Sequence, residues 1–234
     1  MTKEQIYELA RASEQRARFK DTFIDVLHTY DAEAKDIEFL AFVGCLLMTG
    51  NAEADKKTVE DFLCTVRKHT SSVWDYIDRE LYMLDYAIDL RMLPLLMLLH
   101  EIILTTQTIE NSVKLSLQYN DSPSTFFFRL FTNAGMDEYL SDFPQYKVFL
   151  FLSLMVRDEP VGLRLWRDWI SPSHLQVPMN ARLFEAAHEM GILSFYNETD
   201  QNRSLVTSYF RGFFPEDPVR GYFALLSYAD RKAL

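Results

Sequence analysis

The segment that decides the fold runs from Met92 to Gln118 and reads MLPLLMLLHEIILTTQTIENSVKLSLQ. Its first half is apolar on every side, and a helix with that pattern belongs in the interior of a domain. Its second half narrows to one apolar stripe at helical spacing, formed by Ile109, Val113 and Leu117. We therefore predict a central helix over residues 92–118 that is surrounded by other helices at its start and half-exposed at its end.

The composition is that of a globular protein built mainly from helices. Hydrophobic residues make up 48% of the 234-residue chain and charged residues 25%, which supplies enough apolar side chains for a sizeable core. Only seven residues are glycine, and so few glycines disfavour both phosphate-binding loops and multi-stranded barrels. Apolar residues recur with helical periodicity along the chain, for example over residues 3–30, 55–69 and 145–156.

Two short β-favouring runs near the end are the exception to this helical pattern. ILSFY (192–196) and LVTSYF (205–210) flank the polar segment NETDQNRS, an arrangement that predicts a β-hairpin. Helix, glycine, strand, polar tip and strand then follow one another as in a winged-helix domain, which residues 145–212 resemble in this pattern. The predicted fold is mainly α: a multi-helix bundle with a small C-terminal helical part that carries one β-hairpin.

The segment YNDSPS (119–124) is the strongest boundary signal in the sequence, because it combines several turn-forming residues with a proline. It predicts an N-terminal helical bundle over residues 1–118 and a C-terminal helical part with the hairpin over residues 119–234. We expect the two parts to share one core, since the segment from Met92 would otherwise expose too much apolar surface.

The net charge, the N-terminal segment, the length of the apolar runs and the two cysteines predict where the protein acts in the cell. A net charge of −10 disfavours nucleic-acid binding, because an acidic chain repels phosphate backbones. The N-terminus lacks a signal-peptide pattern, and no apolar run reaches the roughly 20 residues that cross a bilayer. Cys45 and Cys64 form no metal motif and are expected as buried thiols in a reducing compartment. We predict a cytoplasmic protein without membrane insertion; a virus-coded protein acting in a host cell would share these features.

An acidic stripe is the candidate that favours an enzyme. Asp75, Asp78, Asp85 and Asp89 fall on one face of a predicted helix, and clustered carboxylates can hold Mg²⁺ for phosphoryl or diphosphate chemistry. The interpretation that we favour is the solvated face of an amphipathic helix, because no second acidic cluster faces the first. A third interpretation is a docking strip for a basic partner. Elsewhere we find no catalytic, metal-binding or cofactor motif, so we predict no cofactor.

Aromatic residues are the second candidate, because they make up 14% of the chain and are enriched both in cores and at protein interfaces. The residues that we single out for an interface are Phe127, Phe128, Trp166, Trp169, Phe213 and Phe214. The alternative, which we favour, is a core between the two parts of the chain.

The lack of a catalytic motif and the aromatic excess together predict a non-enzymatic protein, an adaptor, regulator or structural subunit that binds a protein partner or associates with itself. One alternative is a metal-dependent enzyme that uses the acidic stripe. The other is a nucleic-acid binder that uses the hairpin, although Glu198 and Asp200 at its tip outweigh Arg203 and disfavour a DNA-binding wing. A winged helix of that charge is better suited to packing against protein, as in the helical scaffold domains called PCI.

Overall fold

The computed structural model describes residues 2–16, 22–80, 92–119, 122–136, 146–158 and 161–232. The chain divides into two compact units, unit 1 with Met1–Phe19 and Asp142–Leu234, and unit 2 with Lys20–Ser141. Unit 1 is discontinuous in sequence, because the start of the chain joins its C-terminal part. The division that we expected after residue 118 falls inside unit 2.

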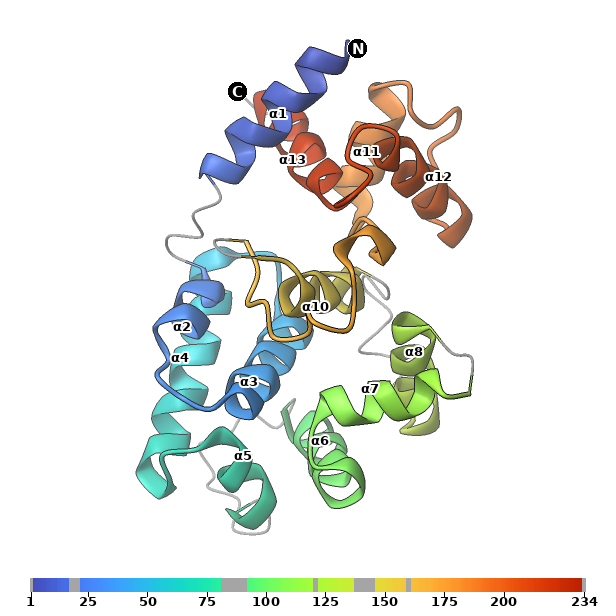
Figure 1. Ribbon diagram of the computed structural model, residues 1–234. Helices are drawn as coiled ribbons and strands as arrows, with labels where there is room; N and C mark the ends of the chain where they lie inside the picture. Colours follow the sequence, from blue (N-terminus) through green and yellow to red (C-terminus); the bar gives the residue numbers. More distant parts are fainter. Residues whose placement is uncertain are drawn as a thin grey trace. The chain divides into compact units, whose positions relative to one another are not determined.

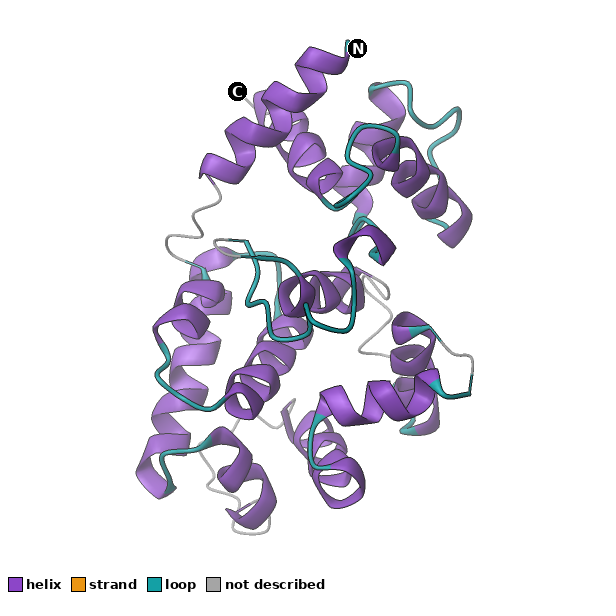
Figure 2. Ribbon diagram, viewed as in Figure 1, coloured by secondary structure: helices purple, strands orange, loops and turns teal. Residues whose placement is uncertain are grey.

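Every regular element in the described ranges is a helix, and none of those residues forms a strand (Figure 2). Unit 2 contains α2 (Phe23–Thr29), α3 (Ala34–Leu47), α4 (Ala52–His69), α5 (Val73–Asp75), η1 (Tyr76–Glu80), α6 (Leu93–Thr106), α7 (Ile109–Leu117) and α8 (Pro123–Asn133). Unit 1 contains α1 (Lys3–Arg16), α10 (Tyr146–Val156), η4 (Pro172–His174), α11 (Ala181–Glu189), α12 (Asp200–Arg211) and α13 (Arg220–Lys232) (Figure 1). Within the described ranges, no helix combines the length and the apolar character that a membrane span requires.

The predicted β-hairpin is wrong, and with it the winged-helix part of the fold class. Residues 192–199 form an irregular connection, and the run LVTSYF belongs to α12. Thr199 caps this helix, because its hydroxyl accepts a hydrogen bond from the backbone N–H three residues later, at 3.2 Å. Val206 and Phe210, four residues apart, are buried while Leu205 is exposed, which is helical periodicity and not the alternation of a strand. Packing and a local cap outweigh β-propensity here.

The predicted central helix over residues 92–118 is divided into α6 and α7. Gln107 has a positive φ of 72°, and its N–H closes α6 by donating to two carbonyl groups of the last turn. Thr108 then caps α7 with its side chain. The buried carboxylate of Glu38, on α3, accepts hydrogen bonds from the first two N–H groups of α7 at 3.0 and 2.7 Å. These contacts fix the direction of α7. The apolar pattern of residues 92–118 does not reveal this change of direction, because helical spacing continues across the break.

The residues described between α10 and η4 form no helix. The backbone N–H groups of residues 163, 164 and 166 donate to carbonyl oxygens in the last turn of α10 and at the residue after it, at 2.6 to 3.0 Å. Gly162 is needed in this fold-back, because a Cβ at that position would lie 2.1 Å from the carbonyl oxygen of Arg157. The segment after α10 therefore covers the C-terminal end of that helix.

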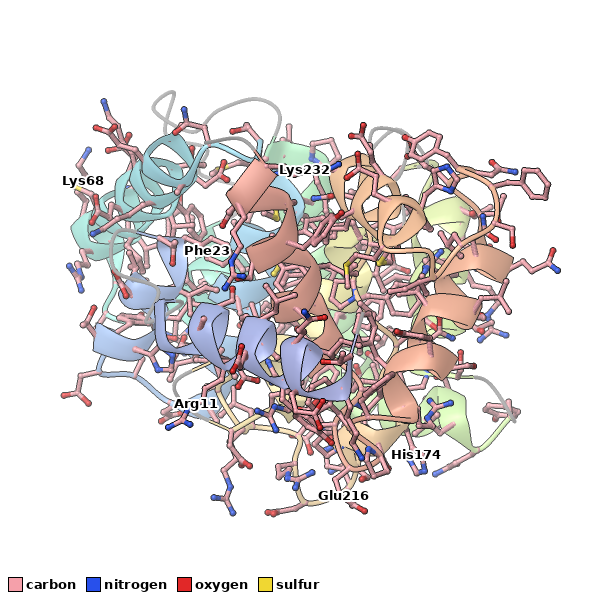
Figure 3. All side chains as sticks on the ribbon, turned by 90° about the horizontal axis from the view of Figure 1, so that it is seen from above. Arg11, Phe23, Lys68, His174, Glu216 and Lys232 are labelled. Atoms are coloured by element: carbon pink, nitrogen blue, oxygen red, sulfur yellow. The ribbon has the colours of Figure 1, made fainter. Side chains whose placement is uncertain are left out.

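Each unit has its own buried side chains. In unit 1, one apolar cluster joins residues of α1, α11, α12 and α13, and α1 lies side by side with α13 (Figure 3). In unit 2, α3 is buried along most of its length. Cys45, on α3, is buried as predicted, whereas Cys64, on α4, is exposed; both are free thiols.

Candidate functional site

A groove of about 310 Å³ lies between α6, α7 and α8 in unit 2. One side of α6 forms its first wall. Leu95, Leu99 and Ile103 are buried in the core, so the residues offset from them by helical spacing face the groove. Among these, Leu98 and Ile102 form the floor and are 4% and 3% exposed.

α7 forms the second wall of the groove. Its small residues there are buried, and its large apolar residues lie at the solvent-exposed rim. Ser112 and Ser116 line the groove and are buried. Their hydroxyls are occupied, the first by Thr106 and the second by a backbone carbonyl one turn back. Leu115 and Tyr119 also line it but are 47% and 74% exposed. The rim of α7 therefore presents uncovered apolar surface to solvent.

α8 forms the third wall, and its orientation is set by aromatic packing underneath. Phe127 and Phe131 are fully buried, and their rings lie 5.6 and 6.0 Å from the ring of Phe42 on α3. This packing turns Phe126 and Leu130 toward the groove. The core and the groove thus use opposite faces of the same helix.

The groove offers apolar contact and two charges of opposite sign, carried by Glu101 and Arg129. Its lining contains no histidine, cysteine or aspartate. The groove can therefore offer apolar contact together with one acidic and one basic side chain to a bound group.

Buried acidic residues elsewhere in unit 2 hold helix ends in place. Asp36 and Asp55 are 3% and 5% exposed. Oδ1 of Asp36 accepts hydrogen bonds from the hydroxyl of Ser72 and the N–H of Trp74, at 2.7 and 2.8 Å. Oδ1 of Asp55 accepts one from the N–H of Thr49 at 2.6 Å. Like Glu38, these carboxylates compensate backbone N–H groups near helix starts, and none of them lines the groove.

The acidic stripe is only partly described. Asp75 and Asp78 lie in α5 and η1, while Asp85 and Asp89 fall outside the described residues. Asp75 lies 3.8 Å from Arg79. No three His, Cys, Asp or Glu side chains within the described ranges gather as a metal ion would require. The metal-dependent enzyme stays a prediction.

The six aromatic residues predicted for an interface have different surroundings. Phe127, Trp166 and Phe214 are buried, and Phe128, Trp169 and Phe213 are half-buried. Trp166 packs edge to face on Phe151, with ring centroids 5.4 Å apart. None of the six lines the groove, and their part in an interface stays a prediction.

Sequence reasoning missed the groove, although one signal was present. Leu115 lies off the apolar stripe of α7 and is therefore expected to face solvent. Tyr119 belongs to the predicted boundary segment, where the sequence gives no sign that its side chain contacts other helices. That these two side chains meet α6 and α8 depends on the break at Gln107, which no local pattern predicts.

A family model described as "Protein of unknown function (DUF2400)" matches residues 24–229 of the chain. The match covers most of the sequence, and the chain belongs to this family. It includes every residue that lines the groove. A comparison with curated proteins found no match. A comparison with solved structures likewise found none.

Proposed function

We propose that this member of the DUF2400 family is a protein-binding module whose groove takes an amphipathic helix from a partner protein. The observation that supports the proposal is uncovered apolar surface at the groove. Leu115 and Tyr119 stand at its rim, and on α6 Met97 and Leu104 flank Glu101 one turn away on either side. These four apolar side chains are 47–74% exposed. Clustered apolar exposure of this kind marks surfaces that bind other proteins.

A helix fits this surface better than an extended peptide. The described part of the chain has no sheet edge on which a peptide strand could pair. The walls of the groove are themselves helices, and the ridges of side chains on one helix pack into the grooves on another. A bound helix would insert apolar side chains spaced at i, i+3 or i+4, and i+7.

The charged residues give the bound helix a direction. Glu101 lies on α6 and Arg129 on α8, so a partner with a basic residue on one flank and an acidic residue on the other is complementary in one orientation. Exposed charge pairs of this kind contribute about 0.2–1 kcal/mol each. They therefore select orientation and partner more than they raise affinity.

Of the two alternative functions, the nucleic-acid binder depended on a hairpin that residues 192–210 do not form. The metal-dependent enzyme depends on residues that are partly outside the described ranges, and no contact of the described ones supports it.

The test is a selection of amphipathic helical peptides, displayed as a randomised library, against the full chain. We expect the enriched sequences to carry apolar residues at helical spacing and to bind with dissociation constants on the order of micromolar in anisotropy titrations. Leu115→Glu places a charge at the rim and should weaken binding at least tenfold. Leu205→Glu is the matched control, because Leu205 is a leucine of similar exposure, 53%, on α12 of unit 1.

Three outcomes would overturn the proposal. Selected peptides that bind Leu115→Glu as tightly as the parent protein would place recognition elsewhere. Enrichment of sequences without helical spacing would exclude a helix as the ligand. Light scattering that shows a dimer of the parent chain, lost in Leu115→Glu, would assign the groove to a second copy of this protein.

A further inference from the structure

The acidic surplus of the chain belongs entirely to unit 2. Residues 20–141 contain twenty Asp or Glu and ten Lys or Arg, whereas unit 1 contains fourteen of each kind. The net charge of −10 is therefore carried by the unit that contains the groove. A charge of that size creates a negative potential around one compact unit, and such a potential raises the rate of encounter with partners of opposite sign.

In unit 1, by contrast, acidic and basic side chains compensate one another. An ion-pair network there lines a cavity of about 300 Å³. Nε of Arg157 donates to Oδ2 of Asp217 at 2.9 Å, and Nη2 of Arg157 lies 3.6 Å from Oε1 of Glu14. Arg220 donates to both carboxylate oxygens of Glu14, at 2.9 and 3.0 Å. Unit 1 therefore adds no net charge to the field of the molecule.

The buried acidic residues of unit 2 leave its surplus intact. Asp36, Glu38 and Asp55 accept hydrogen bonds from backbone N–H groups at 2.6 to 3.2 Å. Peptide groups have a dipole but no net charge, so these bonds stabilise the carboxylates without cancelling their charge. The unit stays strongly negative although these three side chains are well bonded.

The charges at the groove favour the same sign of partner. Glu101 is exposed and has no ion-pair partner among the described residues, whereas Arg129 already has a partner within the chain. On α7, Glu110 and Lys114 pair with each other. Glu101 is thus the lining charge that a bound helix can reach most readily, and a helix that covers the apolar residues on either side of it would bring a polar flank to its carboxylate.

Most of the surplus acts from a distance. The groove helices α6, α7 and α8 carry two acidic and two basic residues, so the excess lies elsewhere in unit 2. A folded unit of this length has a radius of gyration of about 14 Å, and the Debye length is about 10 Å in 0.1 M salt and about 30 Å in 0.01 M. At low salt, charges throughout the unit therefore act on an approaching helix. Such a field changes association rates more than dissociation rates.

We propose that the helix bound by the groove is basic: it has a net positive charge of several units and places a lysine or arginine beside Glu101. The inference rests on the proposed function, because it gives the chemistry of the partner for the same groove. The apolar face of the helix supplies the affinity. The basic residues on its other face speed encounter, and the acidic surplus of unit 2 rejects helices of negative charge.

Three synthetic peptides test the inference. They share the apolar residues of one helical sequence enriched in the selection and differ at the remaining positions, where lysine, glutamine or glutamate gives net charges of about +4, 0 and −4. Stopped-flow anisotropy with the full chain should give at least tenfold faster association for the basic than for the acidic peptide in about 20 mM salt. The ratio should fall to about threefold or less in 200 mM salt, while dissociation rates differ by less than about threefold.

Three variants of the full chain locate the interaction. Glu101→Gln should raise the dissociation constant of the basic peptide about two- to fivefold and leave that of the neutral peptide unchanged. Glu185→Gln is the matched control, because it removes the same charge from an exposed glutamate of unit 1, and it should change neither value. Leu115→Gln keeps the charge of unit 2 and should weaken the binding of all three peptides.

Several results would overturn the inference. Equal association rates for the basic and acidic peptides in low salt would do so and would leave the groove as a helix-binding site. Unchanged binding of the basic peptide to Glu101→Gln would exclude the contact with that carboxylate. A basic peptide that binds Leu115→Gln as tightly as the parent chain would bind outside the groove. If the selection enriches no helical sequence, the proposed function and the inference fail together.

Discussion

The groove of unit 2 and the cavity of unit 1 have nearly the same volume, about 310 and 300 Å³, but they are built in opposite ways. In the groove, the side chains exposed to solvent are not those that hold the helices together. In the cavity, Arg157 and Asp217 both hold the walls and face the open space. The groove should therefore tolerate changes at its rim, whereas changes in the lining of the cavity should alter the stability of the fold.

The largest effect is expected under the groove. Phe127→Ala removes a fully buried ring that packs on Phe42, and such truncations cost about 3–5 kcal/mol. Phe128→Ala changes the half-buried neighbour and should cost no more than about 2 kcal/mol. Urea denaturation followed by hydrogen exchange of peptides from unit 2 measures both. Equal costs would show that α8 does not have a distinct core face formed by Phe127.

Next in size is the loss of the central cation in the cavity. Arg157→Met leaves Glu14 and Asp217 without their shared partner and should lower the free energy of unfolding of unit 1 by about 3 kcal/mol. This lies at the lower end of the usual range, because both carboxylates stay 21–22% exposed. Arg164→Met removes an exposed arginine and should change stability by about 0.5 kcal/mol or less. If both variants were equally stable in urea, the network would not hold the cavity walls.

A third substitution should act in the opposite direction. Arg203 is 4% exposed, yet its ion-pair partner Asp200 is 67% exposed. Two of its guanidinium nitrogens, Nε and Nη1, find no acceptor among the described residues. Burial lowers the pKa of Arg203 to about 10. Because the folded pKa lies below the ordinary value of an arginine, the charged side chain reduces stability at every pH below about 10, and the cost declines as pH rises further.

We therefore expect Arg203→Met to raise the free energy of unfolding at pH 7 by about 1 kcal/mol. This figure allows for the lost contact with the ring of Phe149, at 4.3 Å. Urea denaturation at pH 7 and at pH 10.5 measures the change, and the advantage of the variant should shrink at the higher pH. If Arg203→Met lost as much stability at pH 7 as Arg157→Met, the surroundings of Arg203 would stabilise its charge as well as those of Arg157 do.

The smallest effect on stability is expected at the rim of the groove. Leu115→Glu and Leu205→Glu each change an exposed leucine and should alter the free energy of unfolding by about 0.5 kcal/mol or less. Only the first should weaken the binding of helical peptides. A large stability loss in Leu115→Glu would contradict the separation of binding and structural residues on which the comparison depends.

Helix positions could be predicted wherever the signal is local. Asn180 is of a residue type that favours helix starts, and its Oδ1 accepts a hydrogen bond from the N–H of Leu183 at 3.1 Å to cap α11. Ser122, inside the predicted boundary segment, caps α8 in the same way, with Pro123 at the first helical position. The prediction failed at residues 205–210, because β-propensity was read without the cap that Thr199 supplies.

The groove and the cavity could not be predicted in the same way. Leu115 and Tyr119 become groove residues only because Glu38, more than seventy positions earlier, accepts the N–H groups that start α7. Neither residue type nor spacing distinguishes these two side chains from other exposed apolar residues. The acidic residues of the cavity likewise resemble ordinary surface charges until their partners are known.

The sequence by itself determined that this chain is mainly helical and that it is acidic with material for extensive cores, since these properties depend on composition and on contacts within a few residues. Only the tertiary structure decided that α1 lies beside α13, where Glu14 meets Arg220 across 206 positions, and that α6, α7 and α8 enclose a groove. The physical reason is that burial and charge compensation depend on which side chains far apart in sequence approach one another. Local periodicity reports only on neighbours within one helix.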